Sequence, residues 1–262
     1  MSAVEAVRVE RDGPMLEVTL DRPKANAIDG ATSRRMGEVF AAFRDDPELR
    51  VAILTGAGER FFSAGWDLKA IAADGEADWD MGVGGFGGLQ ELPGLNKPVI
   101  AAVNGMAIGG GFEVAISADL IVAAEHAQFA LPEIKAGILA DAATIKLHRR
   151  IPFHLAMDLL MTGRWIDAAE AQRVGLVRDV VPAAALLDHA RALARMLADG
   201  PPLVLAAIKE VVRETAHLPI AEVFGILERR ELPTIERAYT SEDMVEGARA
   251  FAEKREPRWQ GR

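Results

Sequence analysis

The feature that constrains the fold most is a series of short apolar runs, each followed by a turn, in the first half of the chain. Between Met15 and Leu20, apolar residues alternate with Glu17 and Thr19, which is the period of a half-buried strand. Further apolar runs of strand length lie at 51–54, 99–103, 120–124 and 128–131. Residues 31–43 carry apolar side chains at helical spacing instead. This order of elements predicts an α/β fold.

The second half of the chain has the signals of helices. Gly175 and Gly200 are typical helix stops, and a helix is predicted over 183–198 between them. Predicted helix starts or caps lie at Asp167, Pro202, Pro219 and Ser241. We expect Pro257 to end the last helix. The sequence therefore predicts an α/β core over residues 1–200 and a helical region over residues 201–262.

Composition excludes several classes of function. A formal net charge of −9 argues against a nucleic-acid partner, because phosphates require a basic surface. The absence of Cys excludes disulfides, thiolate zinc sites and cysteine nucleophiles. The five His show no metal-binding spacing, so we expect no metal. Neither a basic–apolar leader nor an apolar run of spanning length is present, and we expect a cytoplasmic protein with no membrane partner.

One glycine pattern is a weak signal. Residues 82–87 match G-x-G-x-x-G, which marks a dinucleotide site only between a strand and a helix. The preceding residues 74–80 are acidic and aperiodic, so we interpret 74–94 as a long loop or broken helix. No Ser stands in G-x-S-x-G, which argues against a hydrolase nucleophile.

Two other glycine-containing segments carry more information. Gly109–Gly111 lie between an apolar strand and a helical segment, where close packing or an oxyanion site at the helix start would both require glycine. In the segment 61–69, small residues precede Trp66, whose backbone N–H is a candidate for the second hydrogen-bond donor of an oxyanion site. The alternative is that this segment is an ordinary turn between a strand and a helix. The sequence alone leaves both alternatives open.

Two carboxylates stand in apolar surroundings. Glu113 lies in the first turn of the helix that the glycines begin, and Glu133 follows Leu131 and Pro132 at the end of a strand. Acidic residues are rarely buried without a role or a partner, although each alone is consistent with an ordinary cap or ion pair. We expect a strand hairpin between them to return Glu133 to the neighbourhood of Glu113.

Taken together, four segments resemble the crotonase (enoyl-CoA hydratase/isomerase) superfamily, and the resemblance covers nearly the whole chain. They are 64–68, 104–105, 109–113 and 131–133. The resemblance implies an α/β fold with a spiral ββα core and a helical C-terminal region that mediates trimerisation, in a homotrimer or a hexamer.

The resemblance also implies roles for individual residues. The backbone N–H groups of Trp66 and Gly110 would form an oxyanion hole for the thioester oxygen, and Glu113 and Glu133 would be the paired acid and base. Which of the two is the acid stays open. The residues implied to bind coenzyme A or substrate are Lys24, Ala25, Ala64, Asp67, Leu68, Phe251 and Lys254. Coenzyme A would be part of the substrate, with no permanently bound cofactor.

Closer likeness in residues 21–29, 61–69 and 251–255 indicates the branch of this family that interconverts carnitinyl-CoA and crotonobetainyl-CoA. Trp66 and Trp79 are candidates for the trimethylammonium group by cation–π contact, with Asp74, Asp78 and Asp80 as counter-charges. A general enoyl-CoA hydratase or isomerase is the alternative within the family. A non-catalytic acyl-CoA- or RNA-binding homologue is the alternative of another class.

One segment departs from the family pattern. After Glu133 the family reads G-x-x-P-D-x-G-G, whereas this chain has Ala140 in place of the proline and Ala142, Ala143 and Thr144 in the region of the two later glycines. We expect these methyl groups to crowd the start of a helix beside the reacting group. The departure leaves the acyl group and the geometry of the water open.

Overall fold

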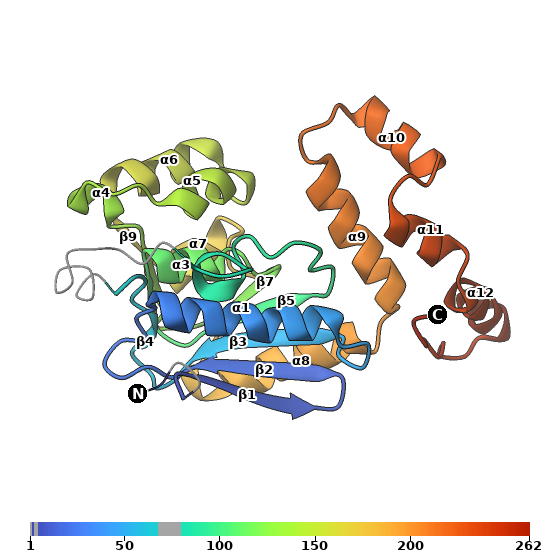
Figure 1. Ribbon diagram of the computed structural model, residues 1–262, viewed down its shortest axis with the longest axis horizontal. Coiled ribbons are helices and arrows are strands. Elements are labelled where there is room, and N and C mark those ends of the chain that lie inside the picture. The colour runs from blue at the N-terminus through green and yellow to red at the C-terminus, as the bar shows by residue number, and fades with distance from the viewer. Residues whose placement is uncertain (1, 3–4, 68–79) are drawn as a thin grey trace.

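The computed structural model describes residue 2, residues 5–67 and residues 80–262. Its strands form a six-stranded sheet of order β1-β2-β3-β5-β7-β10 and a four-stranded sheet of order β4-β6-β8-β9 (Figure 1). The strands are β1 (Val7–Asp12), β2 (Met15–Leu20), β3 (Val51–Gly56), β4 (Phe61–Ser63), β5 (Val99–Val103), β6 (Met106–Ile108), β7 (Leu120–Ala124), β8 (Gln128–Ala130), β9 (Trp165–Asp167) and β10 (Asp179–Val181). The α-helices are α1 (Gly30–Asp45), α3 (Gly110–Ala115), α4 (Glu133–Ala136), α5 (Asp141–Lys146), α6 (Phe153–Thr162), α7 (Ala168–Arg173), α8 (Leu186–Ala198), α9 (Pro202–Thr215), α10 (Ile220–Glu228), α11 (Pro233–Tyr239) and α12 (Glu242–Glu253).

Successive strands alternate between the two sheets. β3, β5 and β7 lie side by side and parallel in the large sheet, while β4, β6 and β8, which follow them in the chain, lie parallel in the small one. A helix follows the second strand of two of these units: α3 follows β6, and α4 follows β8. Because parallel neighbours end at the same edge, α3 and α4 begin close together. This repeat of strand, strand and helix brings Glu113 of α3 and Glu133 of α4 into the same part of the fold.

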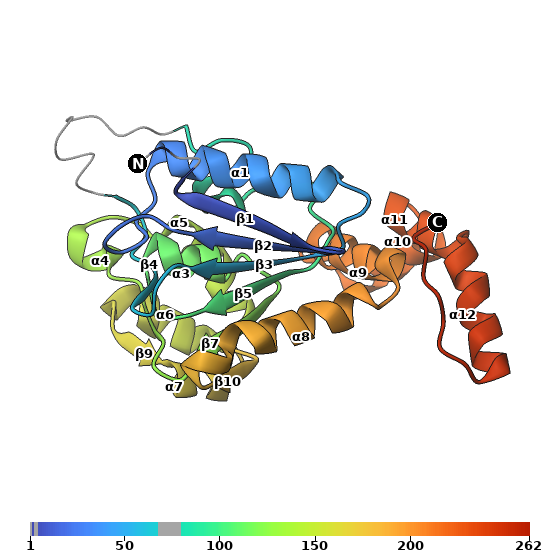
Figure 2. The ribbon, with the colours of Figure 1, turned by 90° about the horizontal axis from the view of Figure 1, so that it is seen from below.

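Helices cover both faces of the large sheet (Figure 2). In β3, Ala52 and Leu54 belong to the apolar cluster that includes Phe40 and Phe43 of α1. The alternate residues Val51 and Ile53 belong to the cluster that includes Leu193 of α8. Successive side chains of a strand point to opposite faces, so a strand covered on both faces is apolar throughout. All six residues of β3 are accordingly buried.

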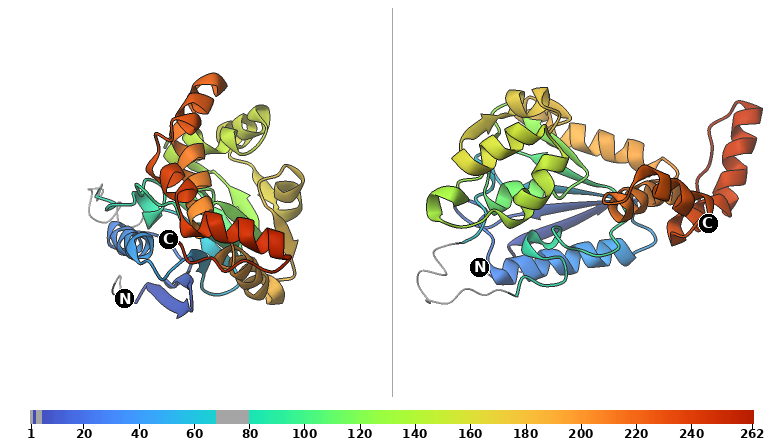
Figure 3. Two further views of the ribbon diagram at one scale, coloured as in Figure 1. Left: turned by 90° about the vertical axis from the view of Figure 1, so that its right-hand side faces the viewer. Right: turned by 90° about the horizontal axis from the view of Figure 1, so that it is seen from above.

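The C-terminal helices α9 to α12 project from the core (Figures 1 and 3). Lys209 of α9 is tied to the core, because its Nζ lies 2.7 Å from Asp119 Oδ2 and donates to the carbonyl of Lys97. Large apolar side chains on these helices are exposed: Val204, Ile208, Val212, Ile220, Phe224, Tyr239, Met244, Val245 and Phe251. None of the helices within the described residues is both long and apolar enough to cross a membrane.

Most of the predicted elements are confirmed, with differences at their ends. The strands predicted at 15–20, 99–103 and 120–124 have those bounds. Ser241 caps α12 through its hydroxyl, which accepts from the N–H of Met244. The predicted stop at Pro257 is wrong, since α12 ends at Glu253 and Lys254 takes a left-handed φ of 54°. β1, α6 and α11 were not predicted.

Candidate active site

The three glycines at the start of α3 each have a neighbour that a side chain would strike. A Cβ on Gly109 would lie 2.3 Å from Oε1 of Glu133, and one on Gly110 would lie 2.6 Å from the ring of Phe86. A Cβ on Gly111 would lie 2.3 Å from the carbonyl oxygen of Ser63. Close packing therefore explains Gly110 and Gly111. At Gly109, where φ is +55°, the glycine also lets a carboxylate approach the backbone.

The segment that carries Trp66 lies against these glycines. Gly65 has a φ of +81°, and a Cβ there would lie 2.8 Å from the backbone nitrogen of Gly110. Ile28 holds this segment, donating its N–H to the Gly65 carbonyl at 2.8 Å and accepting from the N–H of Asp67 at 2.9 Å. A parallel bridge of this register directs the N–H of Trp66 away from Ile28. The structure thus places Gly65, the neighbour of Trp66, against the backbone of Gly110 at the start of α3.

Glu113 is buried, with 7% of its surface exposed. Its Oε1 accepts a hydrogen bond of 2.9 Å from the N–H of Ala143 at the start of α5. Burial raises the pKa of Glu113, and the hydrogen bond from Ala143 opposes the rise. The nearby side-chain amide of Gln90 also lowers this pKa.

Glu133 is the first residue of α4. Its Oε2 is buried and has no hydrogen-bond partner within the described part of the chain. Burial, with a smaller contribution from the charge of Glu113, raises the pKa of Glu133 to about 7. A buried carboxyl oxygen without a partner costs free energy unless a ligand or proton satisfies it. Glu133 therefore keeps its proton to a higher pH than an ordinary glutamate, and Glu113 is close enough to contribute to this effect.

The predicted hairpin between the two glutamates is wrong. β7 lies in the large sheet and β8 in the small one, so the two strands do not pair. Glu133 lies near Glu113 because β8, which precedes Glu133, pairs in parallel with β6, which precedes α3. This pairing places Ala130 beside Ile108. The N–H of Gly109 then donates to the carbonyl of Ala130 at 2.8 Å. The expected proximity of the glutamates holds, and its cause is the pairing of neighbouring units.

The residues at 140–144 that depart from the family pattern do not prevent the start of α5 from contacting Glu113. Ala143 is fully buried, yet its N–H reaches the carboxylate. The next turn of α5 places Lys146 nearby, where its Nζ donates to the hydroxyl of Ser117 at 2.9 Å and to the carbonyl of Gln90 at 2.8 Å. Burial lowers the pKa of Lys146 to about 8. The crowding that the sequence predicts is therefore absent on the side that faces Glu113.

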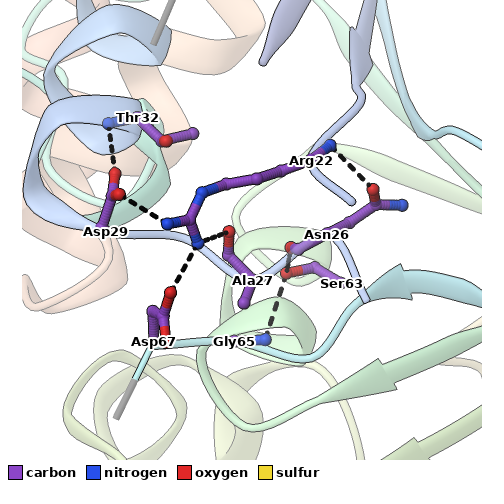
Figure 4. A network of polar contacts seen from close by, with 8 residues as sticks. All are labelled: Arg22, Asn26, Ala27, Asp29, Thr32, Ser63, Gly65 and Asp67. Atoms are coloured by element: carbon purple, nitrogen blue, oxygen red, sulfur yellow. Dashed lines mark hydrogen bonds and ion pairs between the residues drawn. The ribbon is translucent and has the colours of Figure 1, made fainter. Parts of the chain in front are cut away.

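The predicted coenzyme-binding residues fall into two groups. Ala25 and Ala64 lie side by side, joined by a hydrogen bond of 2.9 Å, and exposed Lys24 precedes them with a φ of 80°. Asp67 follows Trp66, and its carboxylate pairs with Arg22 (Figure 4). Leu68 lies outside the described residues.

Phe251 and Lys254 form the second group, on and just after α12. Figures 1 and 2 show α12 at the opposite end of the chain from α3. The side chain of Phe251 is 88% exposed. Within one chain, these two residues therefore lie far from residues 64–67, which we call the oxyanion segment.

A comparison with known families identifies the chain. The sequence profile of the enoyl-CoA hydratase/isomerase family matches residues 10–262. The chain belongs to this family. It is 56% identical to the carnitinyl-CoA dehydratase of Citrobacter koseri, over 98% of this chain and 99% of that protein. It is 55% identical to the carnitinyl-CoA dehydratase of Escherichia coli strain K12, with the same coverage.

Solved structures of the family have the same fold. The enoyl-CoA hydratase of Mycobacterium tuberculosis H37Rv is 39% identical, with a TM-score of 0.89 over 98% of this chain and 99% of that one. The enoyl-CoA hydratase of Bacillus anthracis is 30% identical, with a TM-score of 0.86 over 98% and 100%. The predicted crotonase-type α/β fold is confirmed.

The glycine-rich loop at residues 82–87 does not have the structure of a dinucleotide-binding motif. The G-x-G-x-x-G pattern ends in a single 3-10 turn, η1 (Phe86–Gly88), where an α-helix would be needed. Gly87 packs against Val114 of α3 and Gly88 against Met36 and Gly37 of α1, so the turn fills the space between the two helices. Of the residues proposed for the trimethylammonium group, Trp79, Asp74 and Asp78 lie outside the described residues. Asp80 Oδ1 accepts from the N–H of Gly82.

Sequence reasoning missed four residues of the site: Arg22, Phe86, Gln90 and Lys146. Arg22 falls in the segment 21–29, which the sequence linked only to one branch of the family, and Lys146 lies just after the segment that departs from the family pattern. Lys146 lies one helical turn after Ala142 and Ala143, and a lysine on an otherwise apolar helix face is a sequence signal that could have indicated it. Among residues 5–67 and 80–262, no cluster of acidic and His side chains has the arrangement of a metal site.

Proposed function

We propose that this protein catalyses the reversible dehydration of a 3-hydroxyacyl-CoA, with carnitinyl-CoA as the substrate and crotonobetainyl-CoA as the product. The observation that carries the reaction class is a pair of neighbouring carboxyl groups, Glu113 and Glu133, whose pKa values burial raises, beside the glycines at the start of α3. The relatives named carnitinyl-CoA dehydratase support the choice of acyl group. We propose further that the reaction needs no bound cofactor.

The thioester oxygen would lie between the N–H groups of Trp66 and Gly110. Removing the proton α to a thioester develops negative charge on that oxygen, and donors aimed at it lower the barrier. The first turn of α3 adds the favourable end of a helix dipole. Coenzyme A would pass along the segments that carry Lys24 and Ala64, which lie beside Trp66.

We assign the α-proton to Glu133 and the departing hydroxyl to Glu113. Glu133 Oε1 lies against Gly109, adjacent in sequence to the donor Gly110, which favours a position next to the carbon that bears the thioester. Glu113 lies one turn further along α3, toward Cβ of the substrate. In dehydration Glu133 takes the α-proton while protonated Glu113 gives its proton to the hydroxyl, which leaves as water. Hydration reverses both transfers.

The pH dependence of activity follows from this shared proton. The active pair holds one proton in both directions, because one carboxyl group must be acid while the other is base. Since the pKa of Glu133 is about 7, the pair loses this proton above neutral pH. We expect kcat/KM to be highest below about pH 7 and to fall toward tenfold per pH unit above it.

The pH profile is to be measured with crotonobetainyl-CoA for the parent and for Glu133→Gln. The residual activity of the variant should lack the decline near pH 7. A parental kcat/KM that stays level from pH 6 to pH 9 would contradict the coupled pair. The profile should be the same for hydration and dehydration, because the equilibrium constant involves no net proton.

We also propose that the chain assembles as a homotrimer, alone or in a dimer of trimers, in the cytoplasm, where acyl-CoA substrates are formed. Exposed apolar side chains on α9 and α10, such as Val212 and Phe224, support burial against another copy. Phe251 and Lys254 would then reach the coenzyme pocket of a neighbour. Sedimentation velocity of the full chain should give the mass of three or six copies, and a monomer at micromolar concentration would contradict the proposal.

The reaction class is tested by incubating the protein with crotonobetainyl-CoA and following the absorbance of the conjugated thioester. The proposal predicts loss of this absorbance and a product heavier by one water. Binding of the thioester without any change in absorbance would instead identify a binding protein.

A further inference from the structure

Arg22 lies behind the oxyanion segment, in the turn that follows β2. Its Nη1 lies 2.7 Å from Asp67 Oδ2, and its Nη2 lies 2.7 Å from Asp29 Oδ2 (Figure 4). Nη1 also donates to the carbonyl of Ala27 at 3.0 Å. The three side chains are half-buried. One guanidinium therefore joins two carboxylates from segments that are distant in sequence.

Each carboxylate belongs to a structure that borders the site. Asp29 is the N-cap of α1, and its Oδ1 accepts from the N–H of Thr32 at 2.8 Å. Asp67 directly follows Trp66, whose backbone N–H we assign to the oxyanion hole. Arg22 thus fixes the segment on the C-terminal side of Trp66 to the start of a long helix.

A second set of bonds fixes the other side of Trp66. The hydroxyl of Ser63 donates to the carbonyl of Asn26 at 2.7 Å and accepts from the N–H of Gly65 at 3.1 Å (Figure 4). Asn26 Oδ1 in turn accepts from the backbone N–H of Arg22 at 3.1 Å. The backbone and the side chain of Arg22 therefore act on opposite sides of the same donor.

The charge arrangement makes Arg22 hard to replace. Without the guanidinium, Asp29 and Asp67 would lose the cation that joins them, and repulsion between the two half-buried carboxylates would loosen the contact between the start of α1 and the segment that follows Trp66. The hydrogen bond to Thr32 holds Asp29 in place. Because Asp67 directly follows Trp66, a shift of Asp67 would carry Trp66 with it.

We propose that Arg22 is a positioning residue for the oxyanion hole, acting on the Trp66 N–H through Asp67. The inference rests on the proposed function, because it assumes that this N–H polarises a thioester. Loss of Arg22 should lower kcat more than it raises KM, since the coenzyme contacts lie elsewhere.

The test compares Arg22→Met, Arg22→Lys and the double variant Arg22→Met/Asp67→Asn with the parent. Arg191→Met is the matched control, because Arg191 also binds a carboxylate with two nitrogens, at 2.9 and 3.1 Å from Glu17, on the α8 side of the large sheet. The measurements are kcat and KM for crotonobetainyl-CoA, the thermal midpoint, and the absorbance maximum of bound cinnamoyl-CoA. Polarisation of that thioester by the oxyanion hole shifts its absorbance to longer wavelength.

Arg22→Met should lower kcat by about 10²-fold, the scale of a misplaced catalytic group, with KM within about threefold of the parent and the absorbance shift reduced. Arg22→Lys should recover part of the kcat and part of the absorbance shift. The double variant should be more active than Arg22→Met, because it removes the repelling charge. Arg191→Met should leave kcat and the shift unchanged.

Parental kcat and absorbance shift in folded Arg22→Met would overturn the proposal, as would a double variant less active than the single one. A lower thermal midpoint with an unchanged shift would reduce Arg22 to a structural residue, which also overturns it. Failure of the parent itself to turn over the substrate or to shift the probe would instead reject the proposed function.

Discussion

Replacing either Glu113 or Glu133 with glutamine should lower kcat at least about 10²-fold, the scale of a lost general acid or base. The glutamine side chain keeps the volume and one oxygen, but it can neither take nor give the proton. Binding of the coenzyme A part of the substrate should persist, since the segments that carry Lys24 and Ala64 are separate from both carboxyl groups. The measurement is steady-state turnover of crotonobetainyl-CoA, with binding of free coenzyme A measured alongside.

Glu17→Gln is the matched control for these two variants. Glu17 is a half-buried carboxylate of β2 that pairs with Arg191 on the α8 side of the large sheet. Its replacement should leave kcat unchanged. Near-parental turnover by Glu113→Gln or Glu133→Gln would remove that residue from the acid–base pair.

The second large effect is expected at Gly65. A Cβ there would lie 2.7 Å from the carbonyl oxygen of Ile108 and 2.8 Å from the nitrogen of Gly110. Gly65→Ala should therefore push the Trp66 segment away from α3 and separate the two donors. Losing one oxyanion donor lowers kcat by about 10²–10³-fold, and we expect a loss of this size.

Backbone strain alone must be separated from this displacement. Gly175 has the same φ of +81°, but a Cβ there would have no atom within 4 Å. Both alanine variants carry the cost of a left-handed residue, about 1–2 kcal/mol of folding stability. Only Gly65→Ala should lose turnover. Equal kcat values for the two variants would show that the spacing between Gly65 and Gly110 does not matter for the reaction.

The part of the fold that could be predicted from the sequence is the part with a clear period. The strands of the large sheet are continuous or alternating apolar runs, and three were predicted with their bounds. The period of a strand does not reveal which sheet it joins, so β7 and β8 were assigned to one hairpin although they lie in two sheets. Glu113 and Glu133 could be singled out because carboxyl groups in apolar runs are unusual.

The contacts behind the oxyanion segment could not be predicted in the same way. Arg22 and Asp67 are 45 residues apart, and a polar pair at that separation leaves no periodic signal. An arginine before a proline in a turn is typical of a solvent-exposed loop. Phe251 and Lys254 present a different limit: they lie away from the site within one chain, and their predicted role depends on a neighbouring copy that one sequence does not place.

The central claim is tested most directly by the ratio of kcat/KM for crotonobetainyl-CoA to that for crotonyl-CoA. The two substrates share the thioester, the double bond and coenzyme A, and they differ by the trimethylammonium group. A desolvated cation–π contact contributes about 2 kcal/mol or more, so a ratio of at least about 30 is predicted if the site is built for the cation. Turnover of crotonyl-CoA equal to or faster than that of crotonobetainyl-CoA would contradict carnitinyl-CoA as the substrate.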